Sequence, residues 1–105
     1  MNTLVKSSVF ADWQRDLKDD VAKAHILRRL SNAELGHFGD CEPVGEGVSE
    51  MRIHYGPGYR IYFIRRGQTV YVLLCGGNKT SQKRDISRAR GMAKDLAKDF
   101  EGQDT

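Results

Sequence analysis

Two arginines and a histidine near the middle of the chain have the types and spacing that phosphate chemistry requires. Arg52 and His54 are two residues apart, so on a strand their side chains project from the same face, and Arg60 falls on that face of the next strand. A guanidinium binds phosphate through paired hydrogen bonds and stays charged, whereas an imidazole exchanges a proton near neutrality. The pattern indicates a site that binds a phosphate ester and moves a proton.

The positive charge of the chain is concentrated in one segment. Residues 52–90 contain nine Lys/Arg and one Asp/Glu, whereas residues 1–51 contain six and nine, and residues 91–105 contain two and four. The net charge of the whole chain is only +3. A compact basic segment in a nearly neutral protein is typical of a polyanion-binding surface, such as one for nucleic acid. Charge alone leaves an acidic protein partner open as the alternative.

A glycine-rich stretch, Cys75-Gly76-Gly77-Asn78-Lys79-Thr80-Ser81, leads into the last predicted helix, for which Ser81 is the expected N-cap. Lys83 and Arg84 then fall in the first helical turn, where the helix dipole disfavours cations. Either these side chains simply point into water at small cost, or the helix N-terminus, the glycine-rich turn and the cations together attract an anion such as a backbone phosphate.

Three runs rich in Ile, Val, Tyr and Phe predict the strands that position these residues: 48–55, 58–66 and 69–75. Their short connections permit only antiparallel hairpins. Alternation predicts that one sheet face packs against helices, and this face comprises Met51, Ile53, Ile61, Phe63, Val70, Val72 and Leu74. The opposite face comprises Glu50, Arg52, His54, Arg60 and Tyr62, with Tyr71 and Leu73 behind them. We expect that second face to be too charged to form core.

Helices are predicted before and after this sheet. Residues 3–9 suit a short edge strand, and a first helix follows with the apolar stripe Phe10, Trp13 and Leu17, in which Trp13 is the expected core anchor. A second helix is expected to start near Asp19 and Asp20 and to bury Ala22, Ile26 and Leu30. The glycine-rich residues 36–47 predict a loop. The last helix has the stripe Ile86, Ala89, Ala93, Leu96 and Phe100. These elements predict an α+β fold.

Composition limits the broad class of protein. A chain of 105 residues with 39% hydrophobic and 30% charged residues predicts a single globular domain spanning residues 1–105. Cys41 and Cys75 are expected to be free thiols, and the histidines and cysteines show no metal-ligand spacing, so neither a metal nor another cofactor is expected. The sequence contains neither a membrane-length apolar run nor a signal-peptide stretch, which predicts a cytoplasmic protein.

The chain resembles the addiction-module killer proteins of the RelE/ParE toxin superfamily, which are related to phage Gp49-like and HigB toxins. The resemblance covers about residues 3–97 and is most specific in the run Glu50-Met51-Arg52-Ile53-His54-Tyr55-Gly56-Pro57-Gly58-Tyr59-Arg60. Further matching segments are Phe10-x-x-Trp13-x-x-x-Leu17-x-Asp19, Gly39-Asp40, Leu73-Leu74-Cys75-Gly76-Gly77-Asn78-Lys79 and Gln82-x-x-Asp85-Ile86.

The resemblance implies two N-terminal helices packed on a curved, mainly antiparallel sheet, with a C-terminal helix. It also implies a toxin of a type II toxin–antitoxin module, neutralised by a small helix-turn-helix antitoxin encoded next to it. RelE-type members cleave mRNA on the ribosome without metal, and ParE-type members inhibit DNA gyrase by binding it. A member that only binds its antitoxin is a third possibility. Cleavage of RNA would place Arg65, Lys83, Arg84 and Arg88 as contacts to the RNA backbone.

The resemblance also suggests roles for individual residues. Arg52, Arg60 and Lys79 match basic residues of the RelE-type group, where cations stabilise the charge that develops on the phosphate. RelE itself has a C-terminal tyrosine for proton transfer, but this chain has no tyrosine after Tyr71. His54 is then the candidate general acid or base, unless it only hydrogen-bonds to solvent. In that case a lysine, Lys79 or Lys83, takes its place.

Overall fold

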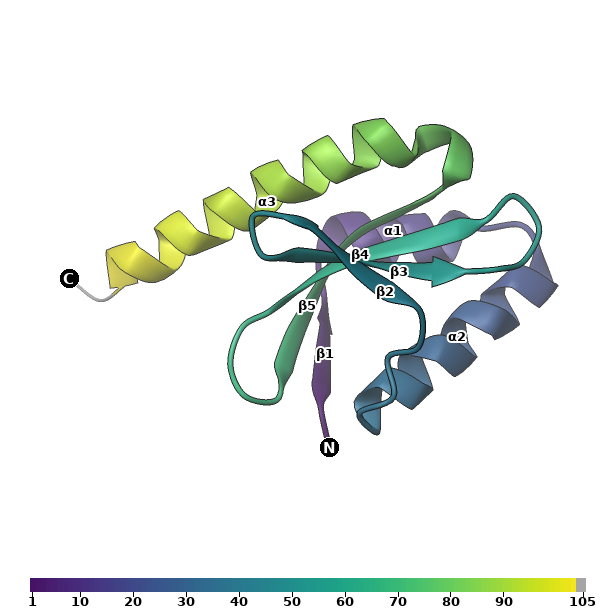
Figure 1. Ribbon diagram of the computed structural model, residues 1–105, viewed down its shortest axis with the longest axis horizontal. Helices are drawn as coiled ribbons and strands as arrows, with labels where there is room; N and C mark the ends of the chain where they lie inside the picture. Colours follow the sequence, from purple (N-terminus) through teal and green to yellow (C-terminus); the bar gives the residue numbers. More distant parts are fainter. Residues whose placement is uncertain (104–105) are drawn as a thin grey trace.

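The computed structural model describes the backbone of residues 1–103 and the side chains of residues 1–98, and it confirms the predicted α+β class. The elements follow the order β1 (Thr3–Lys6), α1 (Ser8–Asp16), α2 (Asp20–Glu34), β2 (Cys41–Gly45), β3 (Val48–Ile53), β4 (Tyr59–Arg65), β5 (Val70–Asn78), the 3₁₀ turn η1 (Lys79–Ser81) and α3 (Gln82–Gln103). Figure 1 shows α3 across the top of the sheet and α2 below it. The side chain of Phe100, predicted on the last apolar stripe, lies outside the described residues.

The strands form one five-stranded sheet in the order β1-β5-β4-β3-β2. β1 and β5 pair in parallel, and the other neighbours in this sheet are antiparallel. The β3–β4 and β4–β5 pairs confirm the two predicted hairpins. Within the β3–β4 hairpin, Arg52 pairs directly with Arg60. The register therefore sets the two arginines side by side on one face of the sheet.

Helices α1 and α2 cover one face of the sheet. Ser7 caps α1 by accepting a hydrogen bond from the Phe10 N–H. Asp19 caps α2, which starts where the sequence predicted it. The core on this side consists of Phe10, Ile26, Leu30, Ala33, Met51, Ile53, Ile61, Phe63 and Leu73. Trp13 packs against this core, which confirms its predicted structural role. The first strand ends at Lys6 and not at Val9, because the Ser7 cap starts the helix there.

Helix α3 covers the opposite face, so the prediction that this face is too charged to form core is wrong. The core there comprises Val48, Tyr62, Leu74, Cys75, Ala89 and Ala93. Glu50 is wholly buried on the same side, and Arg60 is 9% exposed. The charged residues are buried beside the start of α3 because they form ion pairs and hydrogen bonds with one another, which alternation of residue types does not reveal.

The predicted faces of β5 are also wrong. Leu73 belongs to the core under α1 and α2, whereas Leu74 and Val72 lie on the α3 side. The β4–β5 register shifts between Tyr62 and Phe63, which is an irregularity of the β-bulge kind. Since residues 70–75 are almost uninterruptedly apolar, their alternation carries no information about which face each side chain takes.

A further strand, β2, occupies part of the predicted loop 36–47. It pairs antiparallel with β3 at the edge of the sheet, and the pairing shifts between Pro43 and Gly45. Pro43 lacks a backbone donor and glycine is unfavourable in strands, so the composition of this segment is typical of a turn. Pairing with β3 overrides that local preference, and it sets Asp40 just before the strand.

Two consecutive glycines let the layers approach closely at the end of β5. A β-carbon at Gly76 would lie 2.3 Å from Cε3 of Trp13, and one at Gly77 would lie 1.8 Å from Oδ2 of Asp85. Trp13 belongs to α1 and Asp85 to α3, on opposite faces of the sheet. Both helices therefore contact bare backbone at the same point of β5.

The chain leaves β5 through a 3₁₀ turn, η1, that the sequence did not predict. Asn78 caps this turn: its side chain accepts hydrogen bonds from the N–H groups of Thr80 and Ser81. The Ser81 hydroxyl in turn accepts from the Asn78 N–H and donates to Asp85. Helix α3 then begins at Gln82, directly after Ser81, which is the start that the sequence predicted.

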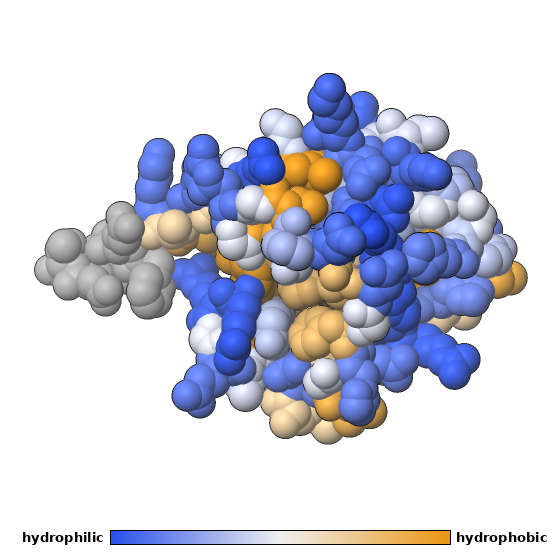
Figure 2. Space-filling view, in the orientation of Figure 1, coloured by the Kyte–Doolittle hydropathy of each residue, from blue (hydrophilic) through white to orange (hydrophobic). Residues whose placement is uncertain are grey.

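Most of the surface is polar. Figure 2 shows a largely hydrophilic face, on which apolar side chains gather beside α3 and again toward the lower edge of the view. Cys41 and Cys75 are both free thiols, as predicted, and Cys75 is buried. Within residues 1–103, no helix combines the length and apolarity needed to cross a membrane.

Candidate active site

A surface pocket of about 460 Å³ lies at the end of the β3–β4 hairpin. The four residues predicted as catalytic, which are Arg52, His54, Arg60 and Lys79, all line it. The turn Tyr55–Gly58 supplies the remaining wall, and its glycines Gly56 and Gly58 have φ values of 57° and 76° that favour glycine. Residues from two strands and from the turn after β5 thus meet around one cavity.

Two carboxylates hold Arg52 in place. Its Nε donates to Oε1 of Glu50 at 3.0 Å, and its Nη2 lies 3.0 Å from Oε2 of Glu42. These contacts raise the pKa of Arg52 above its ordinary value, with the hydrogen bond to Glu50 as the largest cause. Glu42 is 58% exposed at its side chain, whereas Glu50 is fully buried. One of the two ion pairs is therefore open to solvent and the other is internal.

Glu50 lies beneath the pocket at the centre of a buried network. Its Oε2 accepts hydrogen bonds at 2.9 Å from the Tyr62 hydroxyl and from Nε2 of Gln82, the first residue of α3. Burial raises the pKa of Glu50, but the hydrogen bonds outweigh it and the net pKa is lowered. Burial followed by the contact with Glu50 raises the pKa of Tyr62. This carboxylate therefore stays ionised at neutral pH and links α3 to both strands.

Arg60 extends from β4 into the same pocket and is almost fully buried. Its side chain is 11% exposed, and its Nε lies 4.0 Å from Oε2 of Glu50. That distance is an ion-pair contact but not a hydrogen bond. Within the part of the chain whose side chains are described, Nε of Arg60 has no acceptor. That nitrogen is itself buried, so a ligand in the pocket could meet only the small part of the Arg60 side chain that stays exposed.

His54 pairs with Asp40, a residue that matched the family pattern but to which the sequence assigned no role. Its Nε2 lies 2.7 Å from Oδ2 of Asp40, and both side chains are accessible, at 72% and 43%. The hydrogen bond from His54 lowers the pKa of Asp40, partly opposed by burial. The carboxylate is the acceptor, so Nε2 carries the proton and Nδ1 presents its lone pair when the ring is neutral. The partnership was missed because Asp40 precedes a strand that the composition of residues 36–47 concealed.

Lys79 begins the 3₁₀ turn that follows β5, and its backbone N–H donates to the Pro57 carbonyl at 3.4 Å. Its side chain is exposed. The contact joins the end of β5 to the turn between β3 and β4, which brings this lysine to the wall of the pocket.

The predicted RNA-binding residues lie outside the pocket lining. Lys83, Arg84 and Arg88 are exposed along the first turns of α3, which starts three residues after Lys79. Arg65 stands at the other end of β4 from Arg60, about 16 Å along the strand. Its guanidinium donates to the carbonyls of Gly67 and Gln68. The α3 residues lie near the pocket in sequence and Arg65 is remote from it, and their roles stay predictions.

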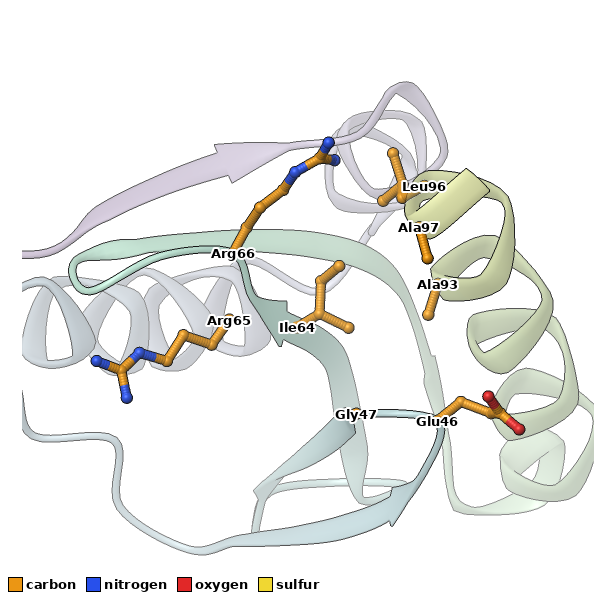
Figure 3. A pocket seen from close by; sticks show the side chains of 8 residues that line it. All are labelled: Glu46, Gly47, Ile64, Arg65, Arg66, Ala93, Leu96 and Ala97. Carbon is orange, nitrogen blue, oxygen red and sulfur yellow. The ribbon is translucent and has the colours of Figure 1, made fainter. Parts of the chain in front are cut away.

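A second pocket of about 360 Å³ lies between α3 and β4, and it differs in chemistry. Figure 3 shows Ala93, Leu96 and Ala97 of α3 facing Ile64, while the guanidinium of Arg65 points away from α3. This cavity is mainly apolar. Among the described residues, no group of three or more His, Cys, Asp or Glu side chains is placed to hold a metal ion, here or in the first pocket.

This small α+β protein belongs to the HigB/RelE-like toxin group, as its family match shows. Residues 12–95 match the family described as "Phage derived protein Gp49-like (DUF891)", and the chain belongs to this family. An uncharacterized protein of Haemophilus influenzae (strain ATCC 51907 / DSM 11121 / KW20 / Rd) is 38% identical over 97 residues, which cover 91% of this chain and 98% of the relative. The resemblance found in the sequence is thus confirmed at the level of the family.

Proposed function

We propose that this protein is the toxin of a type II toxin–antitoxin module and that it cleaves mRNA on the ribosome. The observation that carries the proposal is the pocket, in which three cationic side chains and an aspartate-paired histidine surround one cavity of about 460 Å³. Membership of the HigB/RelE-like toxin group supports the same function. Cations and a proton acceptor in one cavity are what transesterification of RNA requires.

The proposed reaction begins with attack of a ribose 2′ oxygen on the adjacent phosphorus. The bond from phosphorus to the next 5′ oxygen then breaks, which leaves a 2′,3′-cyclic phosphate and a 5′-hydroxyl. Negative charge develops on the non-bridging oxygens in between. Arg60 and Arg52, which both line the pocket, stabilise that charge, because Glu50 holds each guanidinium in place and a fixed cation interacts strongly with charge that develops beside it.

Proton transfer is assigned to the other two residues of the pocket. Asp40 fixes the His54 ring with Nε2–H toward the carboxylate, so Nδ1 is the atom that removes the proton from the 2′-hydroxyl. The ammonium of Lys79 donates a proton to the departing 5′ oxygen. Side chains of the pocket thus perform each step, and we propose a reaction without a metal or another cofactor.

A short synthetic mRNA on purified ribosomes tests the proposal. The wild-type protein is expected to cut it and to leave a 2′,3′-cyclic phosphate, and a single 2′-O-methyl group at the cut nucleotide is expected to abolish that cut. The Arg52→Ala variant should cut at least about a hundredfold more slowly. Arg28→Ala, which removes the same charge from the exposed side of α2, should match the wild type.

Inhibition of DNA gyrase by binding alone is the alternative function. It predicts intact mRNA in the same assay, together with loss of supercoiling by purified gyrase. Transcripts that stay intact while supercoiling stops would therefore replace the ribonuclease proposal with the gyrase-directed one. If neither activity is found while an antitoxin still binds, the chain is a member that retains only antitoxin binding.

We also propose a partner of defined chemistry. Residues 52–90 are strongly basic, and an uncovered basic pocket binds RNA irrespective of its nucleotide sequence. A small helix-turn-helix antitoxin encoded next to this gene, acidic where it meets the pocket, would suppress that binding. Co-expression of the neighbouring reading frame should restore growth and co-purify with this chain. Growth arrest that persists with the neighbour present would contradict this assignment.

A further inference from the structure

Arg29 lies on α2, yet its guanidinium is directed at the backbone that carries the site. Its Nη1 donates to the Arg52 carbonyl, and its Nη2 donates to the Phe38 carbonyl at 2.9 Å, with a longer contact of 3.5 Å to the Asp40 carbonyl. In the part of the chain whose side chains are described, Arg29 has no carboxylate within 4.0 Å. A half-buried cation is thus committed entirely to peptide carbonyls.

Gly39 makes this approach possible. It lies between Phe38 and Asp40, with φ at 72°, and a β-carbon there would lie 2.8 Å from Nη2 of Arg29. A side chain at position 39 would meet the guanidinium and would also strain the backbone. The glycine therefore lets the segment fold around Arg29, and Asp40 leaves that turn at a fixed point.

A second contact joins the same segment to β3. The Asp40 carbonyl accepts a hydrogen bond from the Arg52 N–H at 2.9 Å, while the Asp40 carboxylate contacts Nε2 of His54 at 2.7 Å. Arg29 therefore contacts both sides of this junction, the carbonyl of Arg52 and those of the segment ending at Asp40. Residues 35–40, between α2 and β2, belong to neither a helix nor a strand, so no regular backbone hydrogen bonding holds them in place.

We infer that Arg29 is a positioning residue that sets Asp40 against His54, and this inference rests on the proposed ribonuclease function. Arg29 does not line the pocket, so it acts through the aspartate and not on the RNA. Its charge also contributes to the lowered pKa of Asp40. A lysine cannot replace it, because one ammonium lacks the planar fork that reaches several carbonyls at once.

A double-mutant cycle tests the inference, with single-turnover cleavage of ribosome-bound mRNA as the rate. Arg29→Ala and Asp40→Asn are each expected to slow cleavage about tenfold to a hundredfold, since a misplacement near 1 Å is enough for such a loss. Because both changes break one connection, the double variant should be slower than the more impaired single variant by less than about threefold. Arg28→Ala, adjacent on α2 and exposed, is the matched control and should cut at the wild-type rate.

A second measurement does not depend on cleavage. The ring ¹⁵N chemical shifts of His54 in Arg29→Ala should move toward those in Asp40→Asn, while those in Arg28→Ala stay at the wild-type values. If the wild type cuts no RNA, the ribonuclease function fails, but these shifts still decide the role of Arg29. Unchanged His54 shifts in folded Arg29→Ala, or rate losses that multiply in the double variant, overturn the inference. Should Arg29→Ala not fold, Arg29→Lys serves for the same measurements, because it keeps the charge and the aliphatic stem.

Discussion

Nε of Arg60 lies 4.0 Å from the buried carboxylate of Glu50 and has no hydrogen-bond acceptor among the residues whose side chains are described. The reason lies in the other contacts of Glu50, because Arg52 occupies one carboxylate oxygen and Tyr62 and Gln82 share the other. Arg60 is therefore held beside Glu50 by charge and not by a hydrogen bond from its Nε. Arg52 and Arg60 thus contact the same carboxylate in different ways, Arg52 through a hydrogen bond and Arg60 through an ion-pair contact alone.

Replacement of Arg60 is expected to impair cleavage more than folding. Arg60→Ala should lower the single-turnover rate at least about a hundredfold, because it removes a cation aimed at the developing charge. Arg60→Lys should recover only a small part of that rate, since an ammonium does not make the paired contacts of a guanidinium. The melting temperature of each variant distinguishes a folded protein that has lost activity from a chain that no longer folds. A folded Arg60→Ala protein that cuts at the wild-type rate would remove Arg60 from the mechanism.

Replacement of Glu50 is expected to act first on stability. Glu50→Ala leaves the Tyr62 hydroxyl, the Gln82 amide and the guanidinium of Arg52 without their shared acceptor. Loss of one partner from a buried charged network costs about 3–5 kcal/mol in the free energy of unfolding. Urea denaturation measures this loss, and Glu46→Ala, which removes an exposed carboxylate, should cost less than about 1 kcal/mol. Equal losses in the two variants would show that the network contributes nothing to folding.

The carboxylate of Glu50 should also make the free energy of unfolding decrease as the solution becomes more acidic. The folded-state pKa of Glu50 lies below the unfolded one, so its contribution is complete above the unfolded pKa and is lost as the pH falls through the folded pKa. We expect the gap in unfolding free energy between the wild type and Glu50→Gln to be widest near pH 7 and to narrow between about pH 5 and pH 3. Denaturation of both proteins across this range measures the gap. A gap that stays constant with pH would mean that the carboxylate titrates identically in both states.

Glu42 is expected to limit RNA binding. Its carboxylate competes with phosphate for Nη2 of Arg52, and it is exposed, so the ion pair adds little to stability. Glu42→Gln should therefore tighten binding of a non-cleavable mRNA analogue several-fold with no change in melting temperature. Glu46→Gln makes the same change of charge beside Lys94, away from the pocket, and is the control. If both variants bind the analogue equally more tightly, the cause is the change in net charge of the protein and not the release of Arg52. If neither binds it more tightly, Arg52 does not bind the phosphate.

Local signals in the sequence were sufficient wherever one physical rule dominates. The carboxylate of Asp19 predicted the start of α2, and the turn from Tyr55 to Gly58 predicted the β3–β4 hairpin. That hairpin alone predicts that Arg52 and Arg60 share a face, and so half of the candidate site follows from period-two alternation. The resemblance added Lys79, which alternation could not connect to the hairpin.

The rest depends on contacts between distant segments. β2 was missed because Pro43 and its neighbouring glycines predict a turn, and only pairing with β3 makes the segment a strand. Without β2 there was no reason to bring Asp40 to His54. The burial of Glu50 was missed for a related reason, since its hydrogen-bond partner Gln82 lies 32 positions further along the chain. A charged residue is assigned to the surface when its partners are unknown.

Gly77 lets α3 contact the backbone of β5 close to the candidate site. Asp85 of α3 occupies the space in which a side chain of Gly77 would stand, and Trp13 of α1 does the same at Gly76 on the other face of the sheet. Gln82, three residues before Asp85 on the same helix, donates a hydrogen bond to Glu50. If α3 moved away from the sheet, it would lose this hydrogen bond as well, so the attachment of the helix and the fixing of the carboxylate under the pocket are coupled.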